Sequence, residues 1–396
     1  MSAAQVKVSG VGARRPRDRK AQILTAAAEQ FGTLGYSNAN LTDIAVAVGI
    51  TPGALYRHFR NKEALLAELT SEGSQRFVDV LADDAGFAVT MDGLVALAVS
   101  RRDIGVLWQR EARNLPEAER AELRRRRHFS HQRVSAVIAA HRPSLGTDES
   151  AFLADAVLAV LLSPSYHRAQ VPAERYRAVL AGMIERITDL CLSPNDRGRS
   201  TAREDRPSPH TRRSRRELLL GEATRLFAER GFHTVTMDDI GHATGMAGPS
   251  IYNHFAKKDE ILIAALNRGA DLLDIGLNAA FAQATSTSHA LHLALVSYID
   301  LMTSHPHLVT IVVNETSSLT EPLRHVLRAR QREYLDEWVH LLGTLRPEVD
   351  DGELRAIVLA AVTVINIVVN SSPASERANL ADELAVIGDA VLGLSS

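Results

Sequence analysis

The chain has 396 residues, 45% of them hydrophobic and 23% charged, which is enough apolar material for two or three folded domains and excludes a wholly disordered protein. Its formal net charge of −2 is too small to favour or exclude any class of partner. The single cysteine, Cys191, excludes an internal disulfide framework and is most simply a small apolar core residue. It agrees with a reducing, cytoplasmic location.

No membrane segment is predicted. The N-terminus has no basic region leading into an apolar one, so we expect no signal peptide. The longest mostly apolar run covers residues 356–369 and includes Thr363 and Asn366. A run of this length is too short to cross a bilayer and is more typical of a buried helix.

The first part of the chain predicts a basic arm followed by a small helical domain. Residues 1–17 are small, polar and basic, a composition typical of disorder. A helix pattern covers residues 19–34 and is expected to end at Gly35. Residues 41–62, LTDIAVAVGITPGALYRHFRNK, then form two short helix patterns separated at Gly49, the second running over residues 52–59. Two short helices joined by a Gly-containing turn are typical of a helix-turn-helix unit.

The rest of the first half predicts a helical body. Helix periodicity covers residues 94–113, 116–141, 149–162 and 173–192, without the alternation typical of strands. Residues 193–211 contain three prolines and no large apolar side chain, so they predict a linker. We predict the following ranges: a disordered basic arm at 1–17, a first head at 18–70, a first body at 71–192, the linker at 193–211, a second head at 212–268 and a second body at 269–396.

The chain repeats itself. From Phe31 onward the first head matches the segment from Phe227 without gaps at a spacing of 196 residues. A second register of 204 residues begins at Glu111 and Glu315 and continues to Pro143 and Pro347. The repeated unit therefore includes head and body, which indicates two tandem domains instead of a solenoid of short repeats.

The helix-turn-helix segment resembles the tetracycline-repressor (TetR) family of transcription regulators. The family pattern T-x-x-x-L-Y-x-H-F-x-N-K-E-x-L is found here at Thr51, Leu55, Tyr56, His58, Phe59, Asn61, Lys62, Glu63 and Leu65. The resemblance implies an all-α fold of two tandem units, each with a three-helix DNA-binding head and a helical body for ligand binding and dimerisation. It also implies double-stranded operator DNA and an unknown small-molecule effector as partners.

The family places the second helix of each head in the major groove. In the first head the corresponding residues are Thr51, Pro52, Gly53, Ala54, Tyr56, Arg57, His58 and Lys62. Thr51 would cap the helix, and Arg57 is the best candidate for direct readout because Arg can bridge guanine O6 and N7. Tyr56, His58 and Lys62 would hold phosphates, although Tyr56 and His58 could instead belong to the head core.

The second head differs at several of these positions. Its corresponding residues are Gly248, Pro249, Ser250, Tyr252, Asn253, His254 and Lys258. Ala247 replaces the capping threonine, and Asn253 replaces Arg57. Since Asn favours adenine where Arg favours guanine, we expect the heads to prefer different half-sites. A basic cluster precedes each head, Arg14 to Lys20 in the first and Arg212 to Arg216 in the second, where phosphate attraction is needed.

In the family, the effector acts by changing the spacing of two heads that stand about one DNA turn, roughly 34–36 Å, apart. A short tether favours an intrachain pseudo-dimer of the two bodies, while a homodimer of chains stays possible. Effector-pocket residues cannot be assigned from the sequence, and no cofactor or metal site is predicted. The histidines at 289, 292, 305 and 307 are not flanked by carboxylates or cysteines. We therefore expect surface positions for them instead of a metal site.

Two alternatives stay open. The protein could be a sequence-tolerant, architectural DNA-binding protein, or a regulator with one active head and a second half used for assembly or ligand sensing. An enzyme is not expected because the chain lacks a P-loop and the G-x-G-x-x-G, G-x-S-x-G, H-E-x-x-H and C-x-x-C motifs.

Overall fold

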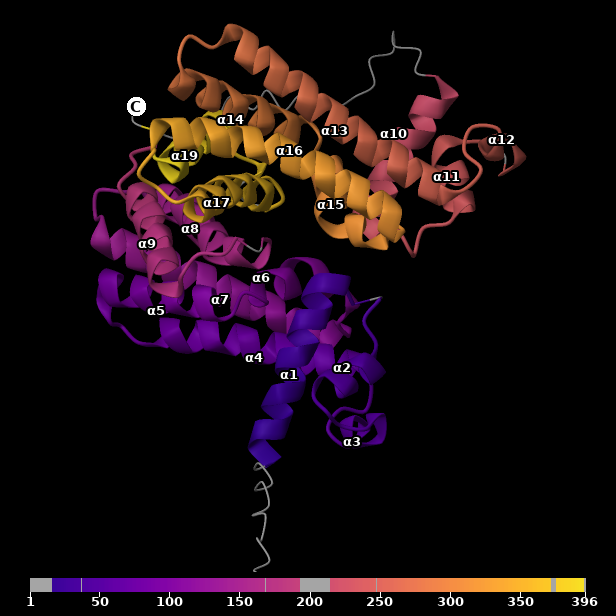
Figure 1. The fold of residues 1–396 in the computed structure, drawn as a ribbon, viewed down its shortest axis with the longest axis horizontal. Coiled ribbons are helices and arrows are strands. Elements are labelled where there is room, and N and C mark those ends of the chain that lie inside the picture. Colours follow the sequence, from indigo (N-terminus) through magenta and orange to yellow (C-terminus); the bar gives the residue numbers. More distant parts are fainter. Residues whose placement is uncertain are drawn as a thin grey trace, which may run out of the picture.

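The computed structural model describes residues 16–36, 38–167, 169–192, 214–246, 248–371 and 375–394. Within these ranges every regular element is a helix, as Figure 1 shows. The predicted all-α fold is therefore confirmed. The predicted arm, except for its last residues, and the whole predicted linker lie outside the described ranges.

The first unit runs from the head to a layered helical body. The head comprises α1 (Pro16–Leu34), α2 (Leu41–Ala47) and α3 (Pro52–Tyr56). The body comprises α4 (Lys62–Ala82), α5 (Gly86–Ser100), α6 (Ile104–Val106), a π-helix (Leu107–Glu111), α7 (Glu117–His141), α8 (Thr147–Leu162) and α9 (Ala173–Thr188). Short 3-10 turns lie at Ala112–Asn114 and Ser163–Ser165.

The second unit repeats this order with one clear difference. Its head comprises α10 (Arg215–Arg230), α11 (Met237–Thr244) and α12 (Gly248–Tyr252). Its body comprises α13 (Lys258–Gln283), α14 (Thr287–Ser304), α15 (Pro306–Glu315), a 3-10 turn (Thr316–Ser318), α16 (Glu321–Leu345), α17 (Asp351–Val369) and α19 (Leu380–Leu392). The regular helix α15 occupies the place that α6 and the π-helix share in the first unit.

Local chemistry explains the helix-turn-helix of the first head. The side chain of Asn40 accepts a hydrogen bond from the Asp43 amide and caps α2. Gly49 has φ +70°, a left-handed conformation that glycine adopts without strain, and it reverses the chain after α2. Thr51 then caps α3 as expected, because its Oγ1 accepts from the Ala54 amide at 3.2 Å.

Three predicted helices are longer than the observed ones, and one of them, predicted over residues 173–192, ends as α9 at Thr188. The predicted helix over residues 94–113 is wrong: α5 ends at Ser100, and Arg101 leaves the helix at φ −125° and ψ 66°. The Arg101 guanidinium pairs with Asp103 at 2.8 Å and holds this break. The predicted helix over residues 52–59 is also too long. It ends as α3 at Tyr56, and the His58 amide donates to the Leu55 carbonyl at 2.9 Å in a tighter closing turn.

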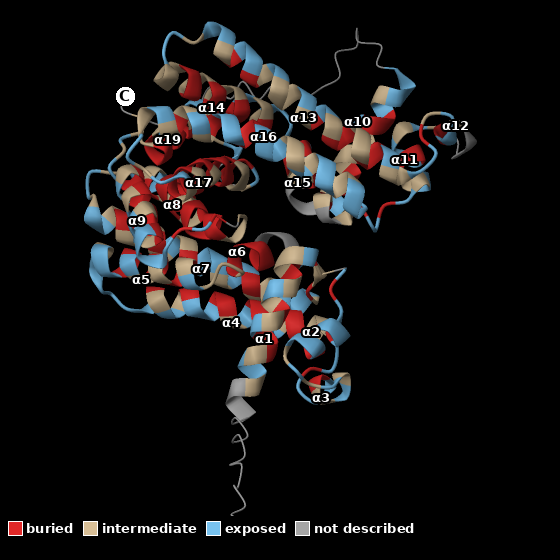
Figure 2. Cartoon of the chain, in the orientation of Figure 1, coloured by how far each residue is buried: buried red, intermediate tan, exposed pale blue. Residues whose placement is uncertain are grey.

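The two bodies pack directly against each other within the chain. Helix α17 of the second body lies on α8 of the first, and α19 lies on α9 (Figure 1). One hydrophobic core continues through the first head and both bodies, and the red segments of α8 and α17 in Figure 2 mark part of it. The second head has a smaller core of its own, which α15 completes through Leu308 and Ile311.

Helix α17 is the one helix of the described residues that is both long and apolar enough to cross a membrane. With 19 residues it has the length and composition of a membrane span, and it starts five residues before the apolar run seen in the sequence. However, 72% of its apolar window is buried inside the protein. Its position between α8 and α16 is that of a core helix, as the sequence predicted.

Candidate DNA-binding surfaces

The candidate reading residues of the first head lie mainly on the surface. Arg57 and His58 are exposed, and Tyr56 is 54% exposed, which argues against a core role for Tyr56 and His58. Thr51 and Gly53 are also exposed, while Pro52 and Ala54 are half-buried. Leu55 and Phe59 are buried and anchor the segment from below. The head therefore presents a polar and basic turn on an apolar support.

The second head presents the corresponding segment with different chemistry. Tyr252 is 55% exposed and Asn253 is exposed, while Ser250 and His254 are half-buried. Gly248 and Pro249 open α12, but the surroundings of their side chains lie outside the described structure, as does Ala247. Asn253 therefore occupies the surface position that Arg57 occupies in the first head.

The structure gives Lys62 and Lys258 a different role from the phosphate contact suggested by the sequence. The Lys62 ammonium donates to the carbonyls of Tyr36 and Ala39 at 2.6 and 2.8 Å and lies over the Tyr36 ring. Lys258 donates in the same way to the carbonyls of Phe232 and Val235 at 2.8 and 3.0 Å. Each lysine thus ties the start of the long helix to the loop before α2 or α11.

Burial shifts the pKa values of Lys62 and Tyr36, which lie together at this contact. Burial lowers the pKa of Lys62, and the nearby Glu111 carboxylate offsets part of that shift. Burial raises the pKa of Tyr36, with Glu63 and Glu111 acting in the same direction. An ammonium that already has carbonyl acceptors and a ring gains little from a phosphate, so we assign Lys62 and Lys258 to head architecture.

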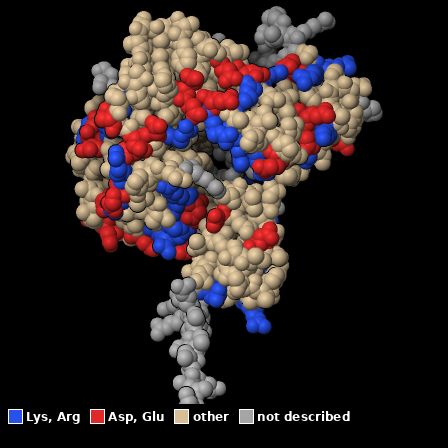
Figure 3. All heavy atoms as spheres, viewed as in Figure 1, with Lys and Arg blue, Asp and Glu red and all other residues tan. Residues whose placement is uncertain are grey.

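One basic residue of each first helix lies against the reading segment of its head. Lys20 in α1 lies over the Phe59 ring at 5.8 Å, and Arg216 in α10 lies over the Phe255 ring at 4.6 Å. These pairs occupy the same positions in the two heads. Each places the first turns of a first helix beside the end of the reading helix. In Figure 3 the lowest part of the first head shows Lys and Arg atoms.

One surface cation was not singled out by the sequence. Arg60 is exposed three residues after Arg57, just before α4. Its counterpart in the second head is Ala256, so a comparison of the two copies of the repeat would have singled out Arg60. The two heads therefore differ at a candidate phosphate contact as well as at a candidate base contact.

The first body encloses buried polar groups that lack hydrogen-bond partners. They are the hydroxyls of Thr70, Thr90 and Ser130 and the indole N–H of Trp108. Their helices α4, α5 and α7 pack on one another, and the Trp108 ring packs on Phe77 of α4 with centroids 4.9 Å apart. In the second body the buried Tyr298 hydroxyl donates to Asn366 Oδ1 at 2.9 Å, whereas the indole N–H of Trp338 also lacks a partner. Buried polar groups without partners are uncommon and call for an explanation.

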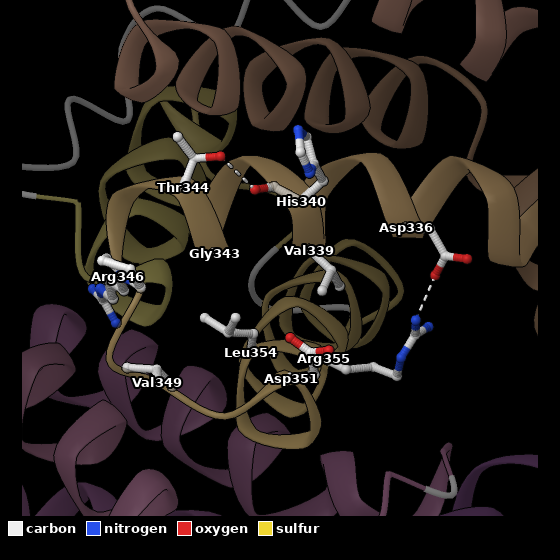
Figure 4. Close-up of a pocket in the computed structure, with 11 residues that line it drawn as sticks. Asp336, Val339, His340, Gly343, Thr344, Arg346, Val349, Asp351, Leu354 and Arg355 are labelled. Carbon is white, nitrogen blue, oxygen red and sulfur yellow. Dashed lines mark hydrogen bonds and ion pairs between the residues drawn. The ribbon is translucent and has the colours of Figure 1, made fainter.

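A surface groove of about 460 Å³ lies where α16 turns into α17, as Figure 4 shows. Its arginines are already engaged. Arg355 pairs with Asp336 at 2.6 Å, and Arg346 donates to the Leu392 carbonyl at 2.6 Å at the end of α19. The groove therefore offers few unpaired groups to a ligand.

The sequence is similar to known proteins over both heads. The family described as "Bacterial regulatory proteins, tetR family" matches residues 23–69 and again residues 219–265. The repressor KstR2 of Rhodococcus jostii is 33% identical over 145 residues, which cover 36% of this chain and 69% of that protein. The activator FasR of Mycolicibacterium smegmatis is 31% identical over 143 residues, 34% of this chain, and the chain spans 63% of its length.

The solved structures are matched one unit at a time. The ketosteroid regulator KstR2 of Mycobacterium tuberculosis has 25% identity and a TM-score of 0.36, and the match covers 40% of this chain and 83% of that one. AibR, solved with isovaleryl coenzyme A and operator DNA, has 23% identity and a TM-score of 0.38, with 43% of this chain and 96% of that one covered.

Proposed function

Because the chain belongs to the TetR family of bacterial transcription regulators, we propose that its two heads bind one operator made of two non-identical half-sites. The observation that carries this proposal is the exposed pair of Arg57 and Asn253 at equivalent positions of the reading segments. Arg favours guanine and Asn favours adenine, so identical half-sites would leave one head mismatched.

The reading helices would enter the major groove, with the other surface residues holding the backbone. Amides at the start of α3, beside Thr51 and Gly53, are suited to phosphate. Tyr56, His58 and Arg60 would contact phosphates in the first head, and Tyr252 and His254 in the second. Pro52, Ala54, Gly248, Pro249 and Ser250 would lie against base edges, where their small side chains offer shape and apolar contact.

We propose that the two bodies of one chain act as the dimer. The support is the core that continues from α8 and α9 into α17 and α19. It includes fully buried residues such as Val160, Ile187, Ile365 and Val391. A second support is the Arg186 side chain of α9, whose Nε donates to the Ala390 carbonyl of α19 at 2.6 Å. Such an arrangement places two heads on one polypeptide without a second chain. We expect it to act on chromosomal DNA in the cytoplasm.

We further propose that the first body binds the effector. The unpaired groups of Thr70, Thr90, Trp108 and Ser130 are donors that an effector oxygen could accept from within apolar surroundings. The relatives KstR2 and a fatty acid metabolism regulator of Bacillus subtilis have names that refer to lipid-derived molecules. We therefore infer a mostly apolar effector with a carbonyl or carboxyl group, which weakens DNA binding and relieves repression.

The effector proposal can be tested with the protein's own fluorescence. Trp108 and Trp338 are its two tryptophans, so Trp338→Phe leaves Trp108 as the reporter. Fatty acids, acyl-coenzyme A thioesters and ketosteroids are then titrated while DNA binding is followed. We expect one class to change Trp108 emission and release DNA. If DNA is released while only the converse variant, Trp108→Phe, reports binding, the site lies in the second body.

The operator proposal is tested by selecting bound sequences from a random DNA library. We expect an asymmetric consensus, and Arg57→Ala should relax the bases of one half-site only. Equal relaxation of both halves would contradict two inequivalent heads. A consensus with a single half-site would favour the alternative of one active head, and the absence of any consensus would favour a sequence-tolerant protein.

A further inference from the structure

Two buried carboxylates end the body segments that pack against the first helix of each head. Glu111 ends the π-helix of the first unit, and Glu315 ends α15 at the equivalent position of the second. They are only 3% and 1% exposed. A buried carboxylate is costly unless donors or a cation compensate it, so the groups that contact each one are informative.

The two carboxylates have different partners. Glu111 Oε2 accepts from the Tyr36 amide of the first head at 3.2 Å and from Asn114 Nδ2 at 3.0 Å, both within its own unit. Glu315 accepts from Ser318 Oγ at 3.1 Å and forms an ion pair with Arg113, which belongs to the first unit. The second unit has Ser317 at the position equivalent to Arg113.

Arg113 also contacts the second head. It lies over Gly231 at the end of α10, where a Cβ would stand 3.2 Å from Arg113 Nη1 and 3.8 Å from Glu315 Oε1. A small cavity beside it is lined by Tyr36 of the first head and His233 of the second. Both heads and both bodies therefore meet around this one guanidinium.

We propose that Arg113 is a positioning residue that fixes the second head relative to the first and thereby sets the half-site spacing. The inference rests on the proposed function, in which both heads bind one operator. Without the guanidinium, Glu315 loses its charge partner, and the contact over Gly231 that joins the first unit to the second head is lost. The second head is then held less firmly against the first unit.

The first experiment measures head placement without DNA, so it does not depend on the proposed operator. In a Cys191→Ser background, spin labels are attached at Val46→Cys and His242→Cys, two exposed and equivalent sites on α2 and α11. We expect a narrow distance distribution in the parent and a broader or shifted one in Arg113→Gln and Glu315→Gln. The control Arg124→Gln removes an exposed ion pair with Glu117 in α7 and should leave it unchanged.

The second experiment measures spacing preference on DNA. Operators with inserted base pairs between the half-sites are compared with the parent operator, and each half-site is also assayed alone. Arg113→Gln should reduce the preference for the parent spacing about tenfold, the ratio that corresponds to 1.4 kcal/mol. Binding to the isolated half-sites should be unchanged, which general loss of structure would not allow.

The outcomes separate this inference from the proposed function. Unchanged distances in both Gln variants would overturn the positioning role, even if the protein binds a two-part operator as proposed. Changed distances with no two-part operator would support head positioning and contradict the proposed function. The double variant should lose no more spacing preference than Arg113→Gln alone, because that variant already removes both the ion pair and the contact over Gly231. If the losses of spacing preference in the two single variants add up in the double variant, that result would also overturn the inference.

Discussion

The two units share the framework of the head but differ in the body segment that packs against it. Lys62 and Lys258 donate equivalent hydrogen bonds to carbonyls of the preceding loop. Lys20 and Arg216 lie over equivalent Phe rings. In the first unit this body segment is a short α6 followed by a π-helix, whereas the second unit has the regular helix α15. Identical head scaffolds can therefore serve different DNA sequences while their attachment to the bodies differs.

This difference explains how the heads contribute to the hydrophobic cores. The first head belongs to the core that runs through both bodies, while the second head forms a separate core with α15. Single-turn π-helices often occur at functional sites. Here the π-helix is followed by Arg113, which forms an ion pair with Glu315 of the second unit.

Exchanging the two candidate reading residues tests the difference between the heads most strongly. Arg57→Asn combined with Asn253→Arg should exchange the preferred bases of the half-sites, with a change in discrimination of up to about 3 kcal/mol. The measurement is competition binding between the parent operator and one with exchanged half-sites. Arg76→Asn, on the exposed side of α4, is the matched control and should leave the preference unchanged. An unaltered preference in the double variant would place base readout elsewhere.

Acid should destabilise the protein partly through a histidine that only the first unit has at this position. Burial lowers the pKa of His167 from 6.5 to about 4, and Arg102 acts in the same direction; the equivalent residue of the second unit is Ser371. The unfolded chain then binds more protons below pH 6.5, so stability falls as the pH drops from 6.5 towards 4.

The expected loss from His167 is about 2 kcal/mol at pH 5 relative to neutral pH. His167→Gln should remove this part of the pH dependence in denaturant unfolding followed from pH 7 to pH 5. His128→Gln, at an exposed position, should keep it. Parallel pH curves for His167→Gln and the parent would show that His167 does not contribute.

The two units also differ in the cap at the start of the long helix that follows each head, and the expected effect on stability is smaller. Asn61 caps α4 by accepting from the Ala64 amide at 2.8 Å, while its counterpart Lys257 makes no side-chain cap. Lys257 has the same extended backbone, so Lys257→Asn should stabilise the start of α13 by about 1 kcal/mol. Hydrogen exchange should slow at the first amides of α13, and Asn61→Lys should have the opposite effect on α4. No change in either would mean that the caps are unimportant here.

The smallest expected effect concerns phosphate attraction. Arg60→Ala should reduce the slope of log affinity against log salt concentration by roughly one, the amount expected for one lost phosphate contact. Ala256→Arg should increase the slope in the second head by a similar amount. Fluorescence anisotropy with labelled DNA at several salt concentrations measures both. A constant slope in Arg60→Ala would remove Arg60 from the interface.

The sequence predicted the repeat, the all-α fold and the surface display of Arg57 and Asn253, because these depend on local patterns and on a spacing that can be read directly. It could not predict the break at Arg101, since the pattern of apolar residues continues across it and the Asp103 pair is a local side-chain effect. The hydrogen bonds of Lys62 could not be predicted from the sequence either, because the carbonyl acceptors lie in a loop 23 to 26 residues away. The contact between Arg113 and Glu315 joins residues 202 positions apart.

The central claim is that one chain supplies both heads to one operator, and the stoichiometry of the complex tests it most directly. Native mass spectrometry of the protein with a single selected operator should show one chain per duplex, with both half-sites protected in footprinting of the same sample. Two chains on one operator, with one head of each chain protecting DNA, would contradict the account.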